Sequence, residues 1–375
     1  MTGIVPPNAT ADRANGRSLL PRTIGGWLPV IAPLVMVFGF MLGCRERLLS
    51  WIREQLAWWF GATFLLFTIL SAFASNGRVR GTTPWEFFLP LFVIGWATTL
   101  ADDSYNISRR TVLRLRVLLQ LAIYGALPVS LFVFNPGTRD LGIAVVLAAS
   151  FAAMLVVGTR RGWWAVIMGF VWIALVLAAF RFDDRSATRL ALAYAPYRDP
   201  ATMSVNAASE WAAKVHQIKL FDANIQAGGL IGAGPGRGHG ETAPNAADDG
   251  VFTLFASQWG WIGALSLVVL YSALLIHALE VAARERSAFD RCVVTGLTMM
   301  IGVPFWLASL GAVRVLPLTG VAAGFVAHGG SKLVASSLAI GLIAAISHRQ
   351  SQTVASDRDV ETAPVMNIKT VIAGR

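Results

Sequence analysis

Long apolar runs recur along the whole chain, separated by short polar or basic turns. A membrane-spanning helix needs roughly 20 predominantly apolar residues, and the pattern predicts nine such spans. They cover residues 25–44, 56–74, 85–101, 115–134, 141–158, 162–180, 251–278, 292–312 and 322–346. Because helices satisfy their own backbone groups in lipid, the predicted fold is an all-α, polytopic membrane bundle of about nine to ten transmembrane helices.

The polar segments define the predicted organisation. Residues 1–24 form an N-terminal tail, residues 25–346 the transmembrane domain, and residues 347–375 a mixed polar tail that is predicted to be disordered. Residues 181–250 form one large loop. Apolar side chains at helical spacing in this loop predict a helix that packs on the membrane domain or covers a groove for a lipid substrate. These side chains are Trp211, Val215, Ile218 and Ile225.

Composition supports this class of protein. Of the 375 residues, 55% are hydrophobic and only 14% are charged, and the mean hydropathy is +0.60. The formal charge of +10 is compatible with a nucleic-acid partner. However, the basic residues gather in the short segments 108–116, 158–162 and 284–291, as expected for cytoplasmic loops. We therefore predict no nucleic-acid partner, and counting spans places the C-terminus in the cytoplasm and residues 181–250 outside.

Three carboxylates stand where predicted spans begin at the outer face. Glu86 precedes the third span, Asp140 the fifth and Asp249 the seventh, where Asp248 is its neighbour. An acidic residue at such a place can simply cap a helix. Ionisable residues at membrane depth are also a frequent mark of function. Cys44 and Cys292 support neither a disulfide framework nor a thiolate metal site.

Five segments carry a likeness to a known family. They are "PWEF" from Pro84, "NPGTRDLG" from Asn135, "HQIKLFDANIQAGGLIGAGPG" from His216, "PNAADDGVFTLFASQWGWIGAL" from Pro244 and "PLTGVAAGFVAHGGSKLVASSLAIGL" from Pro317. In this order they resemble the SEDS family, the RodA/FtsW/SpoVE-type proteins that polymerise lipid-linked peptidoglycan precursor. The matching positions are Pro84, Glu86, Asp140, Gln217, Gly228, Gly229, Gly232, Gly234, Gly236, Pro244, Asp249, Pro317, Thr319, Gly320, Gly329, Gly330 and Ser331.

The chain also departs from the family pattern, so it resembles a divergent member. Leu89 stands where the family has a lysine, and Ala247 where it has a histidine. Ser257 and Gln258 replace a pair of glutamates, and Lys332 replaces a serine. The glycine run by itself indicates only a tight, closely packed turn, because it lacks the lysine and the strand–helix context of a nucleotide site.

The resemblance implies a membrane glycosyltransferase that polymerises lipid II at the outer face of the bacterial cytoplasmic (inner) membrane. It implies a class B penicillin-binding protein as partner, Asp249 as general base, and Glu86 as a support that pairs with a cation. A cation or a divalent metal, Mg or Mn, would stabilise the departing diphosphate, but the sequence identifies no metal ligands. Candidate substrate-binding residues are Lys214, Gln217, Lys219, Arg237, Arg314, Ser331 and Lys332.

Each of these basic residues can equally be an ordinary surface or snorkelling side chain, and two other functions stay open. A flippase for the precursor would favour ionisable residues at the bilayer midplane and paired broken helices. The spans are mostly free of charge, and no internal repeat is evident. A non-catalytic scaffold or regulator of a cell-wall complex is favoured by the lost family residues, whereas the retained Asp249 favours the enzyme.

Overall fold

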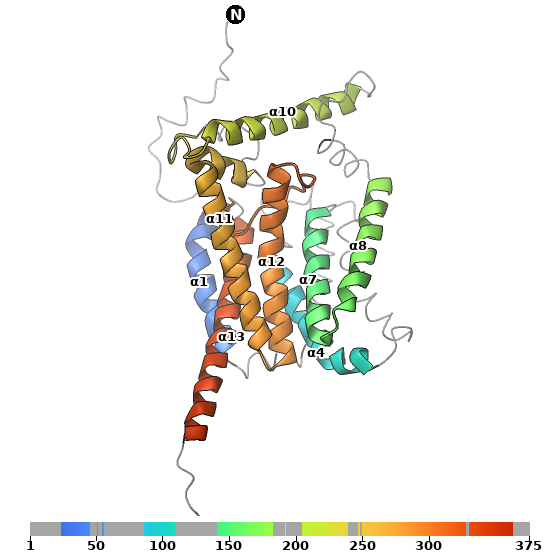
Figure 1. The fold of residues 1–375 in the computed structure, drawn as a ribbon, viewed down its shortest axis with the longest axis vertical. Helices are drawn as coiled ribbons and strands as arrows, with labels where there is room; N and C mark the ends of the chain where they lie inside the picture. The colour runs from blue at the N-terminus through green and yellow to red at the C-terminus, as the bar shows by residue number, and fades with distance from the viewer. Residues whose placement is uncertain are drawn as a thin grey trace, which may run out of the picture.

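The computed structural model describes residues 24–45, 51, 55, 86, 88–109, 141–182, 192, 205–238, 247, 250–327 and 330–362. All regular elements in these ranges are helices, which confirms the all-α prediction (Figure 1). They are α1 (Ile24–Cys44), α4 (Leu89–Arg109), α7 (Leu141–Thr159), α8 (Trp163–Phe182), α10 (Val205–Gly228), α11 (Val251–Arg284), α12 (Ala288–Ala312) and α13 (Gly330–Thr362). The predicted spans 56–74 and 115–134 lie outside the described residues.

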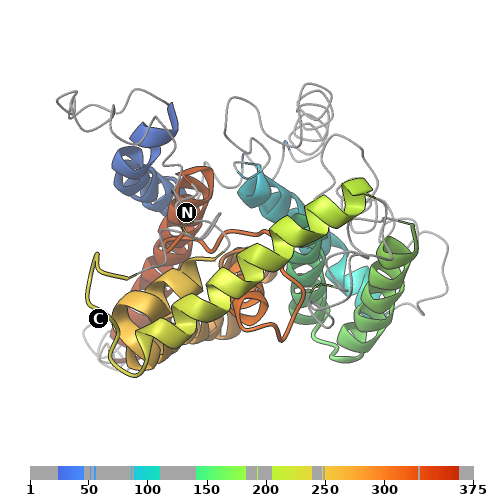
Figure 2. The same cartoon turned by 90° about the horizontal axis from the view of Figure 1, so that it is seen from above.

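The helices form an upright bundle that is covered at one end. Among the described residues, four helices are long and apolar enough to cross a membrane, namely α7, α11, α12 and α13. α1 and α4 contain shorter apolar stretches. In contrast, α10 lies across the ends of the other helices, and the view from above shows it running diagonally over them (Figure 2). The chain is thus a multi-pass membrane protein with one helix lying flat on the bundle, and we refer to the covered side as the α10 end.

α12 is the central helix, since it packs against α4, α7, α11 and α13. The core around it is built from large side chains of α4 and α7, including Phe92, Trp96 and Phe151, with Leu297 of α12. Trp96 and Phe151 meet edge to face with ring centroids 5.1 Å apart. α1 packs along α13 at a distance that only glycine permits, because a Cβ on Gly341 would lie 2.2 Å from the carbonyl oxygen of Met36.

Two boundaries of α13 differ from the prediction. The helix begins at Gly330 and not near residue 322, since the preceding residues 313–327 are irregular and Tyr271 donates a hydrogen bond to the Gly324 carbonyl at 2.9 Å. It continues to Thr362, so the prediction of a disordered tail is wrong for residues 347–362. The described contacts explain this continuation, because Arg349 pairs with Asp290 at 3.1 Å and so ties α13 to α12.

The basic turns gather at the opposite end of the bundle from α10 (Figure 1). Residues 158–162 join α7 to α8 there, and residues 284–291 join α11 to α12. The later part of α13 leaves the bundle on the same side. We call this side the basic end. Its composition agrees with the prediction that these segments share one side of the membrane, and the positive-inside rule predicts that this side is the cytoplasm.

Candidate functional site

A buried polar cluster lies where α4 and α13 begin. Glu86, just ahead of α4, is 8% exposed, and Ser331 and Lys332, in the first turn of α13, are each 5% exposed. The Ser331 hydroxyl donates a hydrogen bond to Oε2 of Glu86, and Nζ of Lys332 lies 3.9 Å from Oε1 of the same carboxylate. The structure therefore brings together three of the residues that the sequence singles out from segments about 245 positions apart.

The positive charge of this cluster lies at an unfavourable place in its helix. A carboxylate is favoured at the positive end of a helix dipole, whereas a lysine there is disfavoured. Lys332 is nevertheless held in the first turn of α13, where it pairs with Glu86. Leu89, at the position of the family lysine, is buried in the apolar core. The cation beside Glu86 thus comes from α13 in this chain.

The glycine-rich segment that follows α10, residues 229–238, forms backbone hydrogen bonds with α11. We call it the glycine segment. α11 is broken at Gly260, which has a φ of 67°. The break leaves carbonyls of Ser257 and Gln258 without partners inside the helix, and they accept hydrogen bonds from the N–H groups of Ala233 and Gly234 at 3.1 and 2.9 Å. Beyond the break, the N–H groups of Trp261 and Ile262 donate to the carbonyls of Gly229 and Leu230 at 3.0 and 3.2 Å.

This contact explains the glycines and corrects one prediction. A Cβ on Gly228 would lie 2.1 Å from the Ala256 carbonyl oxygen, and a Cβ on Gly232 would lie 2.2 Å from that of Gln258. The segment is a tight, closely packed turn, as one interpretation of the sequence holds. The predicted span 251–278 lies within α11, but the prediction lacks the break at Gly260, where a short first part and a longer second part of α11 meet.

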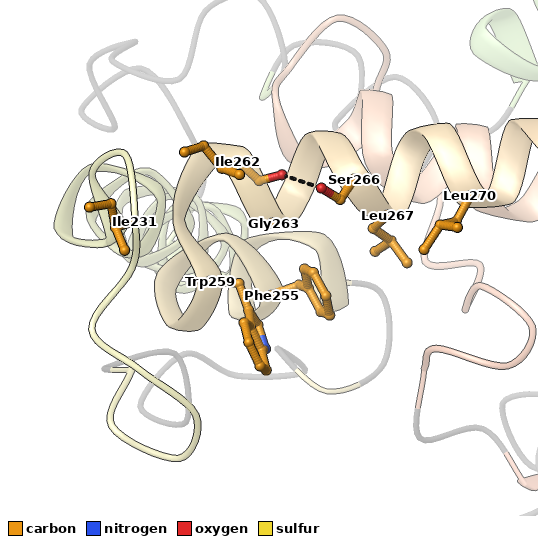
Figure 3. Close-up of a pocket in the computed structure, with 8 residues that line it drawn as sticks. All are labelled: Ile231, Phe255, Trp259, Ile262, Gly263, Ser266, Leu267 and Leu270. Carbon is orange, nitrogen blue, oxygen red and sulfur yellow. Dashed lines mark hydrogen bonds between the residues drawn. The ribbon is translucent and has the colours of Figure 1, made fainter.

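An open apolar groove follows the break. It has a volume of about 470 Å³, and Figure 3 shows the side chains that line it. Phe255 and Trp259 come from the short first part of α11 and stack with centroids 6.1 Å apart. Ile231 reaches the groove from the glycine segment, and Leu267 and Leu270 continue it along the second part of α11. The groove can accept a hydrocarbon chain.

α10 is held on the bundle by apolar contacts and one ion pair. Trp211 and Ile218 are buried on its lower face, as the helical spacing predicts, and both belong to a cluster that packs against Leu318. Nη2 of Arg314 lies 3.1 Å from Oδ2 of Asp222, with both side chains partly exposed. Arg314, a candidate substrate ligand, is therefore engaged by α10. The role of α10 in covering a substrate groove stays a prediction.

The other candidate residues are spread more widely. Gln217 is half-buried, and Lys219 and Arg237 are exposed. Pro317, Thr319 and Gly320 lie in the irregular segment before α13, which starts at Gly330. The remaining candidates lie outside the described residues or have undescribed side chains, and their roles stay predictions: Pro84, Asp140, Lys214, Pro244, Asp248, Asp249 and Gly329.

The structure adds residues that the sequence interpretation missed. One is Asp222, which pairs with the candidate residue Arg314, and the only sequence signal for it is an acidic residue on a predicted helix. Asn224 is buried on α10, one turn before Gly228, and its amide nitrogen finds no hydrogen-bond partner among the described residues. Within the ranges that the structure describes, no three His, Cys, Asp or Glu side chains gather as a metal site would require. The expected Mg or Mn ion therefore stays a prediction.

Comparison with known proteins places this arrangement in a family. Residues 78–352 match the family model FtsW/RodA/SpoVE, described as cell cycle protein. The chain belongs to this family. Among curated SEDS relatives, the peptidoglycan glycosyltransferase RodA of Mycobacterium tuberculosis is 27% identical over 64% of this chain and 48% of its own length. RodA of Mycobacterium leprae is 26% identical over 78% of this chain and 61% of its own. The chain therefore spans only about half to three-fifths of these relatives.

Solved structures share the SEDS fold. A chain from a peptidoglycan synthase complex, described as coordinating polymerization and crosslinking, superposes with a TM-score of 0.65 at 20% identity and covers 88% of this chain and 92% of its own. The rod shape determining protein RodA of Thermus thermophilus superposes with a TM-score of 0.56 at 19% identity and covers 88% of this chain and 89% of its own. At these identities the superpositions establish the fold alone.

Proposed function

We propose that this SEDS protein polymerises lipid II into glycan strands at the α10 end of the bundle. The buried cluster of Glu86, Ser331 and Lys332 is the observation that carries the proposal. Ionisable groups inside a membrane bundle are expensive, and they usually mark sites of binding or chemistry. The cluster stands where α4 and α13 begin, toward the α10 end of the bundle.

Asp249 would act as the general base. It directly precedes Gly250, the N-cap residue of α11. Its carboxylate takes the proton of the acceptor sugar hydroxyl as that oxygen attacks the anomeric carbon of the lipid-linked donor. The new C–O bond forms while the bond from this carbon to the diphosphate breaks. The electron pair of the broken bond leaves with the polyprenyl diphosphate.

Lys332 would supply the charge that this leaving group needs. A fixed cation aimed at the place where negative charge develops stabilises the transition state more than the ground state. Glu86 pairs with Lys332, and Ser331 holds the Glu86 carboxylate through a hydrogen bond. The apolar groove beside Trp259 would accept the isoprenoid chain of the substrate. A class B penicillin-binding protein is the proposed partner, and the SEDS relative from the synthase complex supports it.

The test is glycan-chain formation from labelled lipid II by purified protein, with and without its cognate transpeptidase. We expect Asp249→Asn to abolish polymer and the adjacent Asp248→Asn, as the matched control, to retain it. The reverse result would move the base to Asp248. No polymer from the wild type with its partner bound would reject the enzyme.

A non-catalytic scaffold is the second candidate function. The observation that favours it is the structural use of the positions where the family has two glutamates. Ser257 and Gln258 stabilise the break in α11, since their backbone carbonyls accept hydrogen bonds from N–H groups of the glycine segment. Oε1 of Gln258 also accepts a hydrogen bond from the N–H of Gly236 at 3.4 Å. A wild-type protein that binds the transpeptidase tightly without forming polymer would support the scaffold.

A further inference from the structure

The turn between α7 and α8 concentrates positive charge at the basic end. Arg160 and Arg161 are exposed in this turn, and Arg291 lies in the first turn of α12. α7 and α12 are in contact here, because a Cβ on Gly158 of α7 would lie 3.0 Å from Sγ of Cys292 of α12. Arg160 and Arg291 are close enough for their like charges to act on each other. An anion bound near both side chains would relieve this repulsion.

Arg291 is placed unfavourably in other respects too. Its side chain is only 7% exposed, and Nε is buried with no hydrogen-bond partner among the described residues. Nη1 donates to the backbone carbonyl of Glu285 at 3.2 Å. A cation in the first turn of a helix also faces the positive end of the dipole. Leaving a guanidinium N–H unsatisfied in a buried site is costly, so the geometry favours a bound anion.

The described carboxylates at this end are already engaged. The Glu285 carboxylate accepts hydrogen bonds from the backbone N–H groups of Arg286 at 3.0 Å and of Ser287 at 3.2 Å. Asp290 pairs with Arg349 at 3.1 Å, and Glu280 pairs with Arg284 at 3.4 Å. Within the described part of the chain, Glu285 is the carboxylate whose charge acts on Arg291, and it is shared with other donors.

The surroundings match the head-group region of a bilayer. Trp163 and Trp164 follow the two arginines at the start of α8 and stack with ring centroids 4.4 Å apart. Tryptophan side chains favour the membrane–water interface. The start of α8 also presents the positive end of its dipole, which favours phosphate groups. The same turn therefore offers cations, a helix terminus and the exposed ring of Trp163, whereas Trp164 is buried in the core.

An apolar groove begins beside these charges. It has a volume of about 420 Å³ and lies among α7, α8, α11 and α12. Small side chains such as Ala152, Ala153 and Gly169 leave it open. Thr295 lines it one turn after Arg291, and its hydroxyl donates to the Arg291 carbonyl at 2.8 Å. The groove and the buried guanidinium group are thus neighbours on α12.

We propose that this site binds one anionic phospholipid. Its phosphate lies on Arg160 and Arg291 at the start of α8, and one acyl chain lies in the groove. Basic pockets between spanning helices are suited to such head groups. A polyprenyl phosphate or free phosphate shares part of this chemistry, so the experiment must separate the three. The site is independent of the polymerisation proposed at the α10 end.

The test is native mass spectrometry of the full chain in a zwitterionic detergent, titrated with phosphatidylglycerol. Phosphatidylcholine, a polyprenyl phosphate and inorganic phosphate are the comparison ligands. We expect one tightly bound phosphatidylglycerol, and about five-fold weaker binding for Arg160→Gln and for Arg291→Gln. Arg284→Gln is the matched control, because this arginine lies at the same end, is 73% exposed and already pairs with Glu280. It should change the affinity less than two-fold, or about 0.4 kcal/mol.

A second variant tests the groove separately from the charges. No described atom lies within 4 Å of a Cβ built on Gly169, so Gly169→Leu would fill the groove without moving the backbone. It should weaken phosphatidylglycerol binding at least five-fold with the melting temperature unchanged. Equal binding of phosphatidylcholine, or a loss with Arg284→Gln as large as with Arg160→Gln, would overturn the proposal. Tighter binding of polyprenyl phosphate, or of inorganic phosphate alone, would replace the phospholipid with that ligand.

Discussion

The contact between the glycine segment and the broken helix can be tested with three single substitutions to alanine. Gly228 has no positive φ but lies against backbone, since its Cβ would approach the Ala256 carbonyl oxygen to 2.1 Å. Gly229 has a φ of 51°, and no described atom lies within 4 Å of its Cβ position. Gly232 combines both constraints, with a φ of 90° and a carbonyl oxygen at 2.2 Å. The three sites therefore separate backbone strain from close approach.

The expected losses of stability follow from these geometries. Gly229→Ala should cost about 1–2 kcal/mol, the strain of a left-handed residue with a side chain. Gly228→Ala should cost about 1–3 kcal/mol, since the backbone must move to make room. Gly232→Ala carries both terms, about 2–5 kcal/mol. It also pushes apart a contact held by four backbone hydrogen bonds, each worth about 0.5–1.5 kcal/mol.

The measurement is the melting temperature of each purified variant in the same detergent micelles. The decisive comparison is Gly232→Ala with Gly229→Ala, because both replace a glycine of positive φ four residues or fewer from the end of α10. We expect the Gly232 variant to melt well below the Gly229 variant. Equal melting temperatures would refute the argument that close approach to α11 fixes this segment.

Three further outcomes are expected. Lys332→Met should lower the melting temperature strongly, because removing one partner of a buried pair typically costs about 3–5 kcal/mol. The double variant with Glu86→Gln should recover much of the loss, and no recovery would contradict the pairing. A double-mutant cycle on Asp222→Asn and Arg314→Gln should give a coupling below about 1 kcal/mol, since this pair is partly exposed; a larger value would show that it is desolvated. Truncation after residue 356 should leave the melting temperature unchanged, whereas truncation after residue 347 should lower it through loss of the Arg349–Asp290 pair, and equal effects would exclude this anchor.

The sequence predicts the helices well where length and hydropathy decide. The starts of α7 and α11 agree with the predicted spans to the residue. The sequence does not predict the break in α11, because Gly260 lies in an apolar run and a single glycine is usually tolerated inside a helix. Only the distant glycine segment, which supplies partners for the freed backbone groups, makes the break stable.

The candidate site is predictable in part. Family resemblance selects Glu86 and Ser331, and the missing family lysine raises the question of a substitute. Which basic residue lies beside Glu86 is decided by packing between α4 and α13, and periodicity carries no information on such a contact. The polar composition after residue 346 predicts disorder. It does not reveal the helix there, because the ion pair of Arg349 with Asp290 joins positions that are far apart in the chain.

The break at Gly260 has a consequence for motion. A glycine with a φ of 67° inside a spanning helix resembles a hinge. Here the glycine segment makes hydrogen bonds to carbonyl groups of α11 before the break and to N–H groups after it, so it holds both parts of the helix. Rotation of one part of α11 against the other at Gly260 would require all four of these hydrogen bonds to open together, so the bend is held in one conformation. Any rearrangement that admits a substrate must therefore carry the end of α10 and both parts of α11 as one rigid piece.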